Sequence, residues 1–124
     1  MKGFVFLASP YSHPLSEVRQ SRFEAAERAC VNYFNRGGTL YSPIVHWHSL
    51  AVKYNLPPNF EAWARMNDPL IEQCRAVHVL EIDGWLTSAG VQHEIEVALT
   101  FMKPVFVASP FKDYGLRRLK DALT

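Results

Sequence analysis

Short apolar runs alternate with amphipathic segments along the chain. Three runs that are rich in Val, Phe and Ile end in turn-forming residues, at 3–8, 76–82 and 104–108. Runs of this kind are typical of strands that are buried on both faces. A weaker run covers 39–42. The pattern therefore predicts four short strands.

Apolar residues at helical spacing lie between these runs. The first helical stripe stops before Gly37 and Gly38, which favour the end of a helix. Its members are Leu15, Val18, Ala26, Ala29, Cys30, Tyr33 and Phe34. A second stripe consists of Val91, Ile95, Ala98, Leu99 and Met102. The segment 43–67 mixes prolines with aromatic residues, and we expect one or two short helices there.

The alternation of strands and helices predicts the fold class. Strand, helix, strand units at this spacing form parallel sheets with right-handed crossovers. We expect one α/β domain over residues 1–124, a three-layer sandwich with four or five parallel strands in the order 2-1-3-4(-5). In such sheets ligands bind beyond the carboxyl ends of the strands, where the strand order reverses. The loops 9–13 and 83–90 should therefore face each other.

Composition and charge narrow the function classes. The 124 residues are 48% hydrophobic and 20% charged, which fits one globular domain. Thirteen basic and 12 acidic residues leave a net charge of +1, so no electrostatic footprint for a nucleic acid polymer or an anionic membrane is expected. No run approaches the ~18 apolar residues of a membrane span. We expect a cytoplasmic protein whose two cysteines are small buried hydrophobes inside helices.

Glu94 is the carboxylate of the second stripe that leans towards the sheet. On a helical wheel of about 100° per residue it lies roughly 60° from the edge of the stripe, whereas His93 and Glu96 should point to solvent. It falls in the first turns of a helix that begins near 88–90, where the helix dipole favours the ionised form. Glu94 could act as a nucleophile or stabilise a cation, or it could merely complement the dipole.

Three further polar or aromatic features each have a structural interpretation. Ser88 and Gly90 could hold a phosphate on the N-terminal amides, although Ser88 is also a plausible N-cap. Asp68 before Pro69 matches an N-cap followed by the first helical position, so we expect a helix to begin there. The aromatic residues of the loops could stack on a base or close the edge of a core. They are Tyr11, Trp47, Trp63 and Trp85.

His46 and His48 suggest a metal site, because two histidines two residues apart can share one face of a strand. No third ligand is in register with them, and neither cysteine is near in the sequence. We therefore expect no bound metal and no cofactor.

Three segments together resemble the nucleoside 2-deoxyribosyltransferase-like superfamily. They are the FVFLASPYS stretch at 4–12, Asp68, and the SAGVQHE stretch at 88–94, followed by Ala98. The resemblance covers nearly the whole chain, and its Ser-x-Gly-x-x-x-Glu element is the most specific part. It implies a flavodoxin-like, Rossmann-like fold and an enzyme that cleaves or exchanges the N-glycosidic bond of a nucleoside or nucleoside 5′-monophosphate. The Gly-Trp pair at 84–85 resembles an uncharacterised branch.

The resemblance also implies roles for individual residues. Glu94 matches the nucleophile, and Asp68 matches an aspartate that holds the sugar and assists the departing base. Apart from the resemblance, His46 is a second choice for the proton donor, because an imidazole titrates near neutrality. Ser88 matches the serine of nucleotide N-hydrolases, which favours water as the acceptor. The expected catalytic residues are thus Glu94 and Asp68. The expected substrate-binding residues are Ser9, Tyr11, Ser12, His46, Asp83, Trp85, Ser88 and Gly90.

The chain departs from the family pattern at two places. Phe6 stands where the family has a tyrosine that contacts the glutamate, and no arginine follows the first strand. The superfamily often completes its site across a subunit interface, so a homo-oligomer is expected.

A nonenzymatic nucleotide-binding or sensing module would keep the crevice without needing Glu94. A structural subunit would instead fill the crevice with Trp85 and Tyr11.

Overall fold

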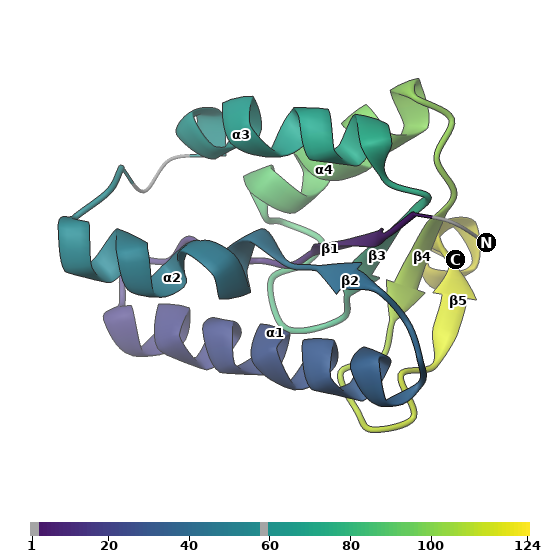
Figure 1. The fold of residues 1–124 in the computed structure, drawn as a ribbon, viewed down its shortest axis with the longest axis horizontal. Coiled ribbons are helices and arrows are strands. Elements are labelled where there is room, and N and C mark those ends of the chain that lie inside the picture. The colour runs from purple at the N-terminus through teal and green to yellow at the C-terminus, as the bar shows by residue number, and fades with distance from the viewer. Residues whose placement is uncertain (1–2, 58–59) are drawn as a thin grey trace.

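The structure, a computed structural model, describes residues 3–57 and 60–124 (Figure 1). Residues 58 and 59, which fall in the segment expected to hold one or two helices, lie outside this description. The elements in chain order are β1 (Val5–Ala8), α1 (Ser16–Asn35), β2 (Leu40–Tyr41), α2 (Pro43–Tyr54), α3 (Phe60–Gln73), β3 (Ala76–Leu80), α4 (Ala89–Thr100), β4 (Val105–Ala108), β5 (Leu116–Arg118) and α5 (Leu119–Ala122).

The strands form one sheet in the order β2-β1-β3-β4-β5. The first four are parallel, and Val5 at the start of β1 pairs with Leu40 on one side and Ala76 on the other. β5 runs antiparallel to β4, because the connection 109–115 is too short for the crossover of a dozen or more residues that a parallel partner needs. The predicted α/β sandwich and its strand order are confirmed.

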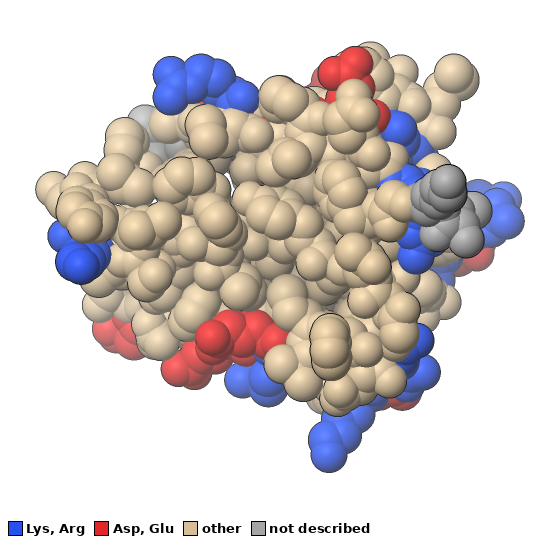
Figure 2. All heavy atoms as spheres, viewed as in Figure 1, with Lys and Arg blue, Asp and Glu red and all other residues tan. Residues whose placement is uncertain are grey.

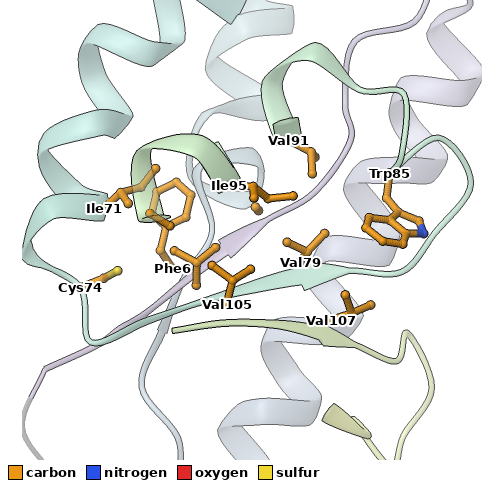
Figure 3. Close-up of a cluster of buried hydrophobic side chains, with 12 residues drawn as sticks. Phe6, Ile71, Cys74, Val79, Trp85, Val91, Ile95, Val105 and Val107 are labelled. Carbon is orange, nitrogen blue, oxygen red and sulfur yellow. The ribbon is translucent and has the colours of Figure 1, made fainter. Parts of the chain in front are cut away.

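Helices cover both faces of the sheet (Figure 1). α3 and α4 lie over one face, α1 lies over the other, and α2 packs beside α1. Side chains of the central strands alternate between the two faces, as the strand period requires. Phe6 and Val79 join the core under α3 and α4 (Figure 3), whereas Leu7 and Leu80 join the core under α1.

Both predicted helical stripes are too wide. Leu15 and Phe34 of the first stripe are exposed, because Leu15 precedes the first turn of α1 and Phe34 lies about 140° around the helix from the buried Ala29. Leu99 and Met102 of the second stripe are also exposed. Met102 lies beyond the end of α4, and Leu99 lies at the margin of the face formed by the buried residues of α4. These are Val91, Ile95 and Ala98.

The expectation that a helix begins at Asp68 is wrong, because α3 runs from Phe60 to Gln73 with Pro69 inside it. Buried residues at Asn67, Ile71 and Cys74 continue one stripe across the proline. Burial of that stripe therefore outweighs the single backbone hydrogen bond that proline removes. The N-cap and proline pattern occurs instead at the start of α2, where Ser42 caps the helix and Pro43 follows it.

The two cysteines are free, with Cys30 half-buried in α1 and Cys74 buried just after α3. Cys74 therefore lies outside the helix in which it was expected. Over 3–57 and 60–124, none of the helices combines the length and the apolar character needed to cross a membrane.

Candidate active site

A pocket of about 470 Å³ opens beyond the carboxyl ends of β1 and β3. Ser9, Tyr11 and Ser12 reach it from the loop after β1, and Gly84 and Thr87 reach it from the loop after β3. The expectation that these two loops face each other is confirmed. The volume is in the range of small-molecule sites.

Two walls face each other across this pocket. The α1–α2 wall consists of Tyr11, Arg22, Pro43, Ile44, Trp47, His48 and Ala51. The α3–α4 wall consists of Trp63, Ala64, Asn67, Ser88, Ala89, Gly90, His93 and Glu94. Trp47 and Trp63 contact each other with ring centroids 5.6 Å apart, so the walls meet at this aromatic pair.

Arg22 of α1 ties the two loops together. Its Nη1 donates to the Ser12 carbonyl at 2.9 Å and its Nη2 donates to the Asp83 carbonyl at 3.4 Å. Gly84 permits this approach, because its φ is +93° and a Cβ there would lie 2.6 Å from Nη2. Sequence reasoning missed Arg22, since the resemblance directed attention to the segment directly after β1 and nothing in the helix marks this arginine.

Glu94 lies on the second turn of α4 and faces Asn67 of α3, whose Nδ2 donates to Glu94 Oε2 at 3.5 Å. Burial raises the pKa of Glu94 to about 8, the negative charge of Asp68 adds to this, and the Asn67 hydrogen bond opposes it. This raised pKa favours the protonated form, in contrast to the ionised form that the helix dipole was expected to favour. The helix dipole acts within the first turn, and Glu94 lies beyond it.

His93 and Asp68 form a pair beside Glu94. His93 Nε2 lies 3.0 Å from each carboxylate oxygen of Asp68, so the ring donates to the carboxylate. His93 lines the pocket, which overturns the expectation that it points to solvent. Asp68 itself does not line the pocket and reaches it through His93.

Two buried polar atoms of the pocket have no hydrogen-bond partner in the part of the chain that the structure describes. They are Ser9 Oγ and Asn67 Oδ1. Their side chains belong to residues that are only 7% and 4% exposed. Because buried polar atoms in folded proteins are almost always hydrogen-bonded, water or a ligand that enters the pocket would supply the missing partners.

The α1–α2 wall carries a chain of hydrogen bonds. The Tyr11 hydroxyl lies 2.7 Å from His48 Nδ1, and His48 Nε2 lies 2.9 Å from Gln20 Oε1. The His48 ring stacks on Phe23 with centroids 4.1 Å apart. Burial lowers the pKa of His48 and raises the pKa of Tyr11, so both side chains are neutral at pH 7.

Ser88 caps α4, as expected, by accepting a hydrogen bond from the Val91 amide at 3.2 Å. Ser88 and Gly90 line the pocket together with the α4 N-terminus. The residues expected to hold a phosphate therefore share one cavity with Glu94.

Besides Asp68, three residues expected at the site do not line the pocket. His46 is exposed beside Tyr41, because α2 is a helix and places His46 about 200° from the pocket-facing His48. Asp83 is exposed and reaches the site only through its carbonyl. Trp85 belongs to the hydrophobic core (Figure 3). The interpretation as a structural subunit required Trp85 to fill the pocket, and Trp85 does not fill it.

No group of three or more His, Cys, Asp or Glu side chains in the described part of the chain is arranged to hold a metal ion.

The curated proteins contain no match to the chain. The family described as "Domain of unknown function (DUF1937)" matches residues 3–110, which include the first four strands and both walls of the pocket. This match spans most of the sequence, and the chain belongs to the DUF1937 family.

Proposed function

We propose that this protein is an N-glycosidase that cleaves the bond between base and sugar in a nucleoside 5′-monophosphate or nucleoside, with Glu94 as the nucleophile and water as the acceptor. The observation that carries the proposal is the position of Glu94, inside a small-molecule pocket and next to the His93–Asp68 pair. The resemblance to the nucleoside 2-deoxyribosyltransferase-like superfamily supports the same chemistry.

Cleavage requires a carboxylate below C1′. As the C1′–N bond breaks, its electron pair leaves with the base and positive charge develops on the sugar. Ionised Glu94 attacks C1′ and forms a glycosyl ester, which water then hydrolyses to regenerate the carboxylate. With its pKa raised to about 8, Glu94 is ionised to a growing extent as the pH rises above 7. No cofactor is needed for either step.

The departing base needs a proton, and His93 is suited to supply it. The ring lines the pocket one residue from Glu94, and Asp68 fixes its orientation by accepting from Nε2. The Asp68 carboxylate also balances the charge of a doubly protonated ring. In this proposal Asp68 acts as a positioning residue through His93, and His46 takes no part because it lies outside the pocket.

Positive charge at the mouth of the pocket favours a phosphorylated substrate. Arg22 lines the pocket together with Ala89 and Gly90 in the first turn of α4. Helix N-termini bind phosphate through their exposed amides, and a guanidinium adds charge-assisted hydrogen bonds. Ser88 can still donate its hydroxyl hydrogen while its oxygen caps the helix.

Location and assembly are parts of the same proposal. A nucleotide substrate and two free cysteines are consistent with the cytoplasm. A homo-oligomer is supported by the face that carries α2, where Figure 2 shows a largely uncharged centre and Val52 and Tyr54 are exposed. Sedimentation at micromolar concentration is expected to give a species larger than the 14.2 kDa chain.

One observation favours a second candidate, a nonenzymatic nucleotide-binding or sensing module. Glu94 is mostly protonated at neutral pH, and a protonated carboxyl binds a ligand but does not attack it.

A panel of nucleosides and nucleoside 5′-monophosphates distinguishes these functions. Free base released from each compound is measured by chromatography at pH 8, where about half of Glu94 is ionised. Release of base from at least one compound is expected. Binding without release from any compound would favour the sensing module.

A further inference from the structure

The hydrogen-bond chain on the α1–α2 wall has a direction, and its outer end determines that direction. Gln20 Nε2 donates to Glu24 Oε2 at 3.1 Å. A carboxylate only accepts hydrogen bonds, so the amide nitrogen of Gln20 must face Glu24 and its oxygen must face His48. The opposite amide orientation would bring two acceptors together at Glu24.

Each further donor follows from this orientation. His48 Nε2 must carry a hydrogen and donate to Gln20 Oε1, 2.9 Å away. A neutral imidazole carries one N–H, so Nδ1 is then an acceptor. The Tyr11 hydroxyl must therefore donate to Nδ1 at 2.7 Å. The single hydroxyl hydrogen of Tyr11 is used inside the wall, and only its oxygen lone pairs are left for a ligand.

We propose that Tyr11 is a specificity-determining residue that presents the pocket with a hydrogen-bond acceptor and thereby selects ligands with an amino group at this wall over ligands with a carbonyl oxygen there. A carbonyl opposite Tyr11 would leave two acceptors facing each other without a hydrogen between them. An unsatisfied pair of this kind weakens binding by about tenfold or more. Asn67 Oδ1 has no partner among the residues that the structure describes, so the opposite wall of the pocket offers an acceptor as well.

The class of ligand in this inference rests on the proposed function. Glu94 reacts with the sugar at the α3–α4 wall, and His93 protonates one edge of the base from the same wall. The base therefore extends across the pocket, and its other edge meets the α1–α2 wall. That wall offers the apolar surfaces that suit a flat ring, from Ile44, Trp47 and Ala51. The amino group is then an exocyclic amine, and adenine- or cytosine-type compounds are preferred over hypoxanthine- or uracil-type compounds.

Binding of adenosine and inosine tests the inference. These nucleosides differ at one position, where adenosine has an amine and inosine has a carbonyl. The Glu94→Gln variant is titrated with each by calorimetry, so that neither is cleaved during the measurement. Adenosine is expected to bind at least about tenfold more tightly than inosine. Equal binding, or tighter binding of inosine, would overturn the inference.

Two substitutions in the Glu94→Gln background test whether the preference depends on the direction of the hydrogen bonds or only on the shape of the wall. Tyr11→Phe removes the acceptor, so the preference for adenosine falls towards one. His48→Phe keeps Tyr11 but frees its hydroxyl hydrogen, which then donates to a carbonyl and raises the affinity for inosine. His46→Phe, on the same helix but outside the pocket, is the matched control and keeps the preference. An unchanged preference in His48→Phe would overturn the inference.

Nitrogen NMR of wild-type His48 gives a measurement that needs no variant and no ligand. The expected signals are those of a neutral ring with hydrogen on Nε2, and hydrogen on Nδ1 would contradict the direction of the chain. If Glu94→Gln prefers adenosine but the wild-type protein releases no base from any compound, the result counts against the proposed function and supports the inference. Failure of both nucleosides to bind at millimolar concentration would overturn the ligand class of the inference.

Discussion

The two walls of the pocket differ in how well their polar groups are satisfied. On the α1–α2 wall, Tyr11 and His48 are neutral and belong to a continuous chain of hydrogen bonds. On the α3–α4 wall, Glu94 is half-buried near the charge of Asp68, and Asn67 Oδ1 has no partner among the described residues. One wall is organised before a ligand arrives, whereas the other holds unfavourable electrostatics that a ligand would relieve.

This contrast assigns different steps to the two walls. Groups whose protonation and pairing change during a reaction act on the chemical step, and substitutions there lower kcat. Groups whose charge and pairing stay the same throughout act on binding, and substitutions there change KM or the choice of ligand. Each of the following substitutions tests that division on one wall.

The largest effect is expected for Glu94→Gln. The variant keeps the shape of the side chain but loses the charge that attacks C1′, so kcat should fall by at least ~10²-fold. Glu96→Gln, exposed on the same helix, is the control and should keep full turnover. Base release at saturating substrate measures both variants. Turnover of Glu94→Gln within a few-fold of wild type would end the catalytic assignment.

Asp68→Asn should have the next largest effect. It removes the carboxylate that orients His93, so kcat should fall by about tenfold. It also removes a negative charge that raises the pKa of Glu94, so the rise of the rate with pH should shift to lower pH. Glu72→Gln, one turn further along α3, is the control. A lower rate without a shifted profile would separate Asp68 from Glu94.

Arg22→Gln tests the α1–α2 wall. The KM for a nucleoside 5′-monophosphate should rise by about tenfold, while the KM for the matching nucleoside changes little. Arg28→Gln, exposed on the same helix, should alter neither value. Equal losses for the two substrates would show that Arg22 only holds the loops through Ser12 and Asp83.

The smallest effect concerns stability. Folded Glu94 keeps its proton up to about pH 8, whereas the unfolded chain releases it near pH 4.5, so the free energy of unfolding should fall as the pH rises between these values. Glu94→Gln lacks this loss. The window from pH 6.5 to 8 excludes His78, whose pKa is lowered by burial to about 4.

Thermal unfolding measures this difference. Over that window the Tm of wild type should fall by a few °C relative to Glu94→Gln. Parallel curves of Tm against pH for the two proteins would mean that Glu94 is ionised in the folded state. The two walls of the pocket would then differ less in their electrostatics.

The fold was predictable to a larger extent than the site. Buried parallel strands are recognisable as apolar runs, and Ser88 at a helix start has a local signal, so the loops after β1 and β3 could be matched in advance. Asn67 and His93 carry no such signal, because their roles depend on the packing of α3 against α4. The ionisation of Glu94 also depends on burial by residues that are distant in the sequence.

Local rules also misled where packing opposed them. Asp68 and Pro69 form a typical helix start, but the buried stripe of α3 passes through them. On a strand His46 and His48 would share one face, whereas the helix separates them and leaves only His48 in the pocket. In both places the decisive information was which face of a helix meets the rest of the protein.

The contact between Trp47 and Trp63 has an optical consequence. The chain has three tryptophans, two of which meet at the pocket while Trp85 is sealed in the core. A ring that stacks at the pocket would quench the emission of the first two and leave that of Trp85 unchanged. Intrinsic fluorescence thus contains its own internal standard, and occupancy of the pocket can be followed without any attached dye.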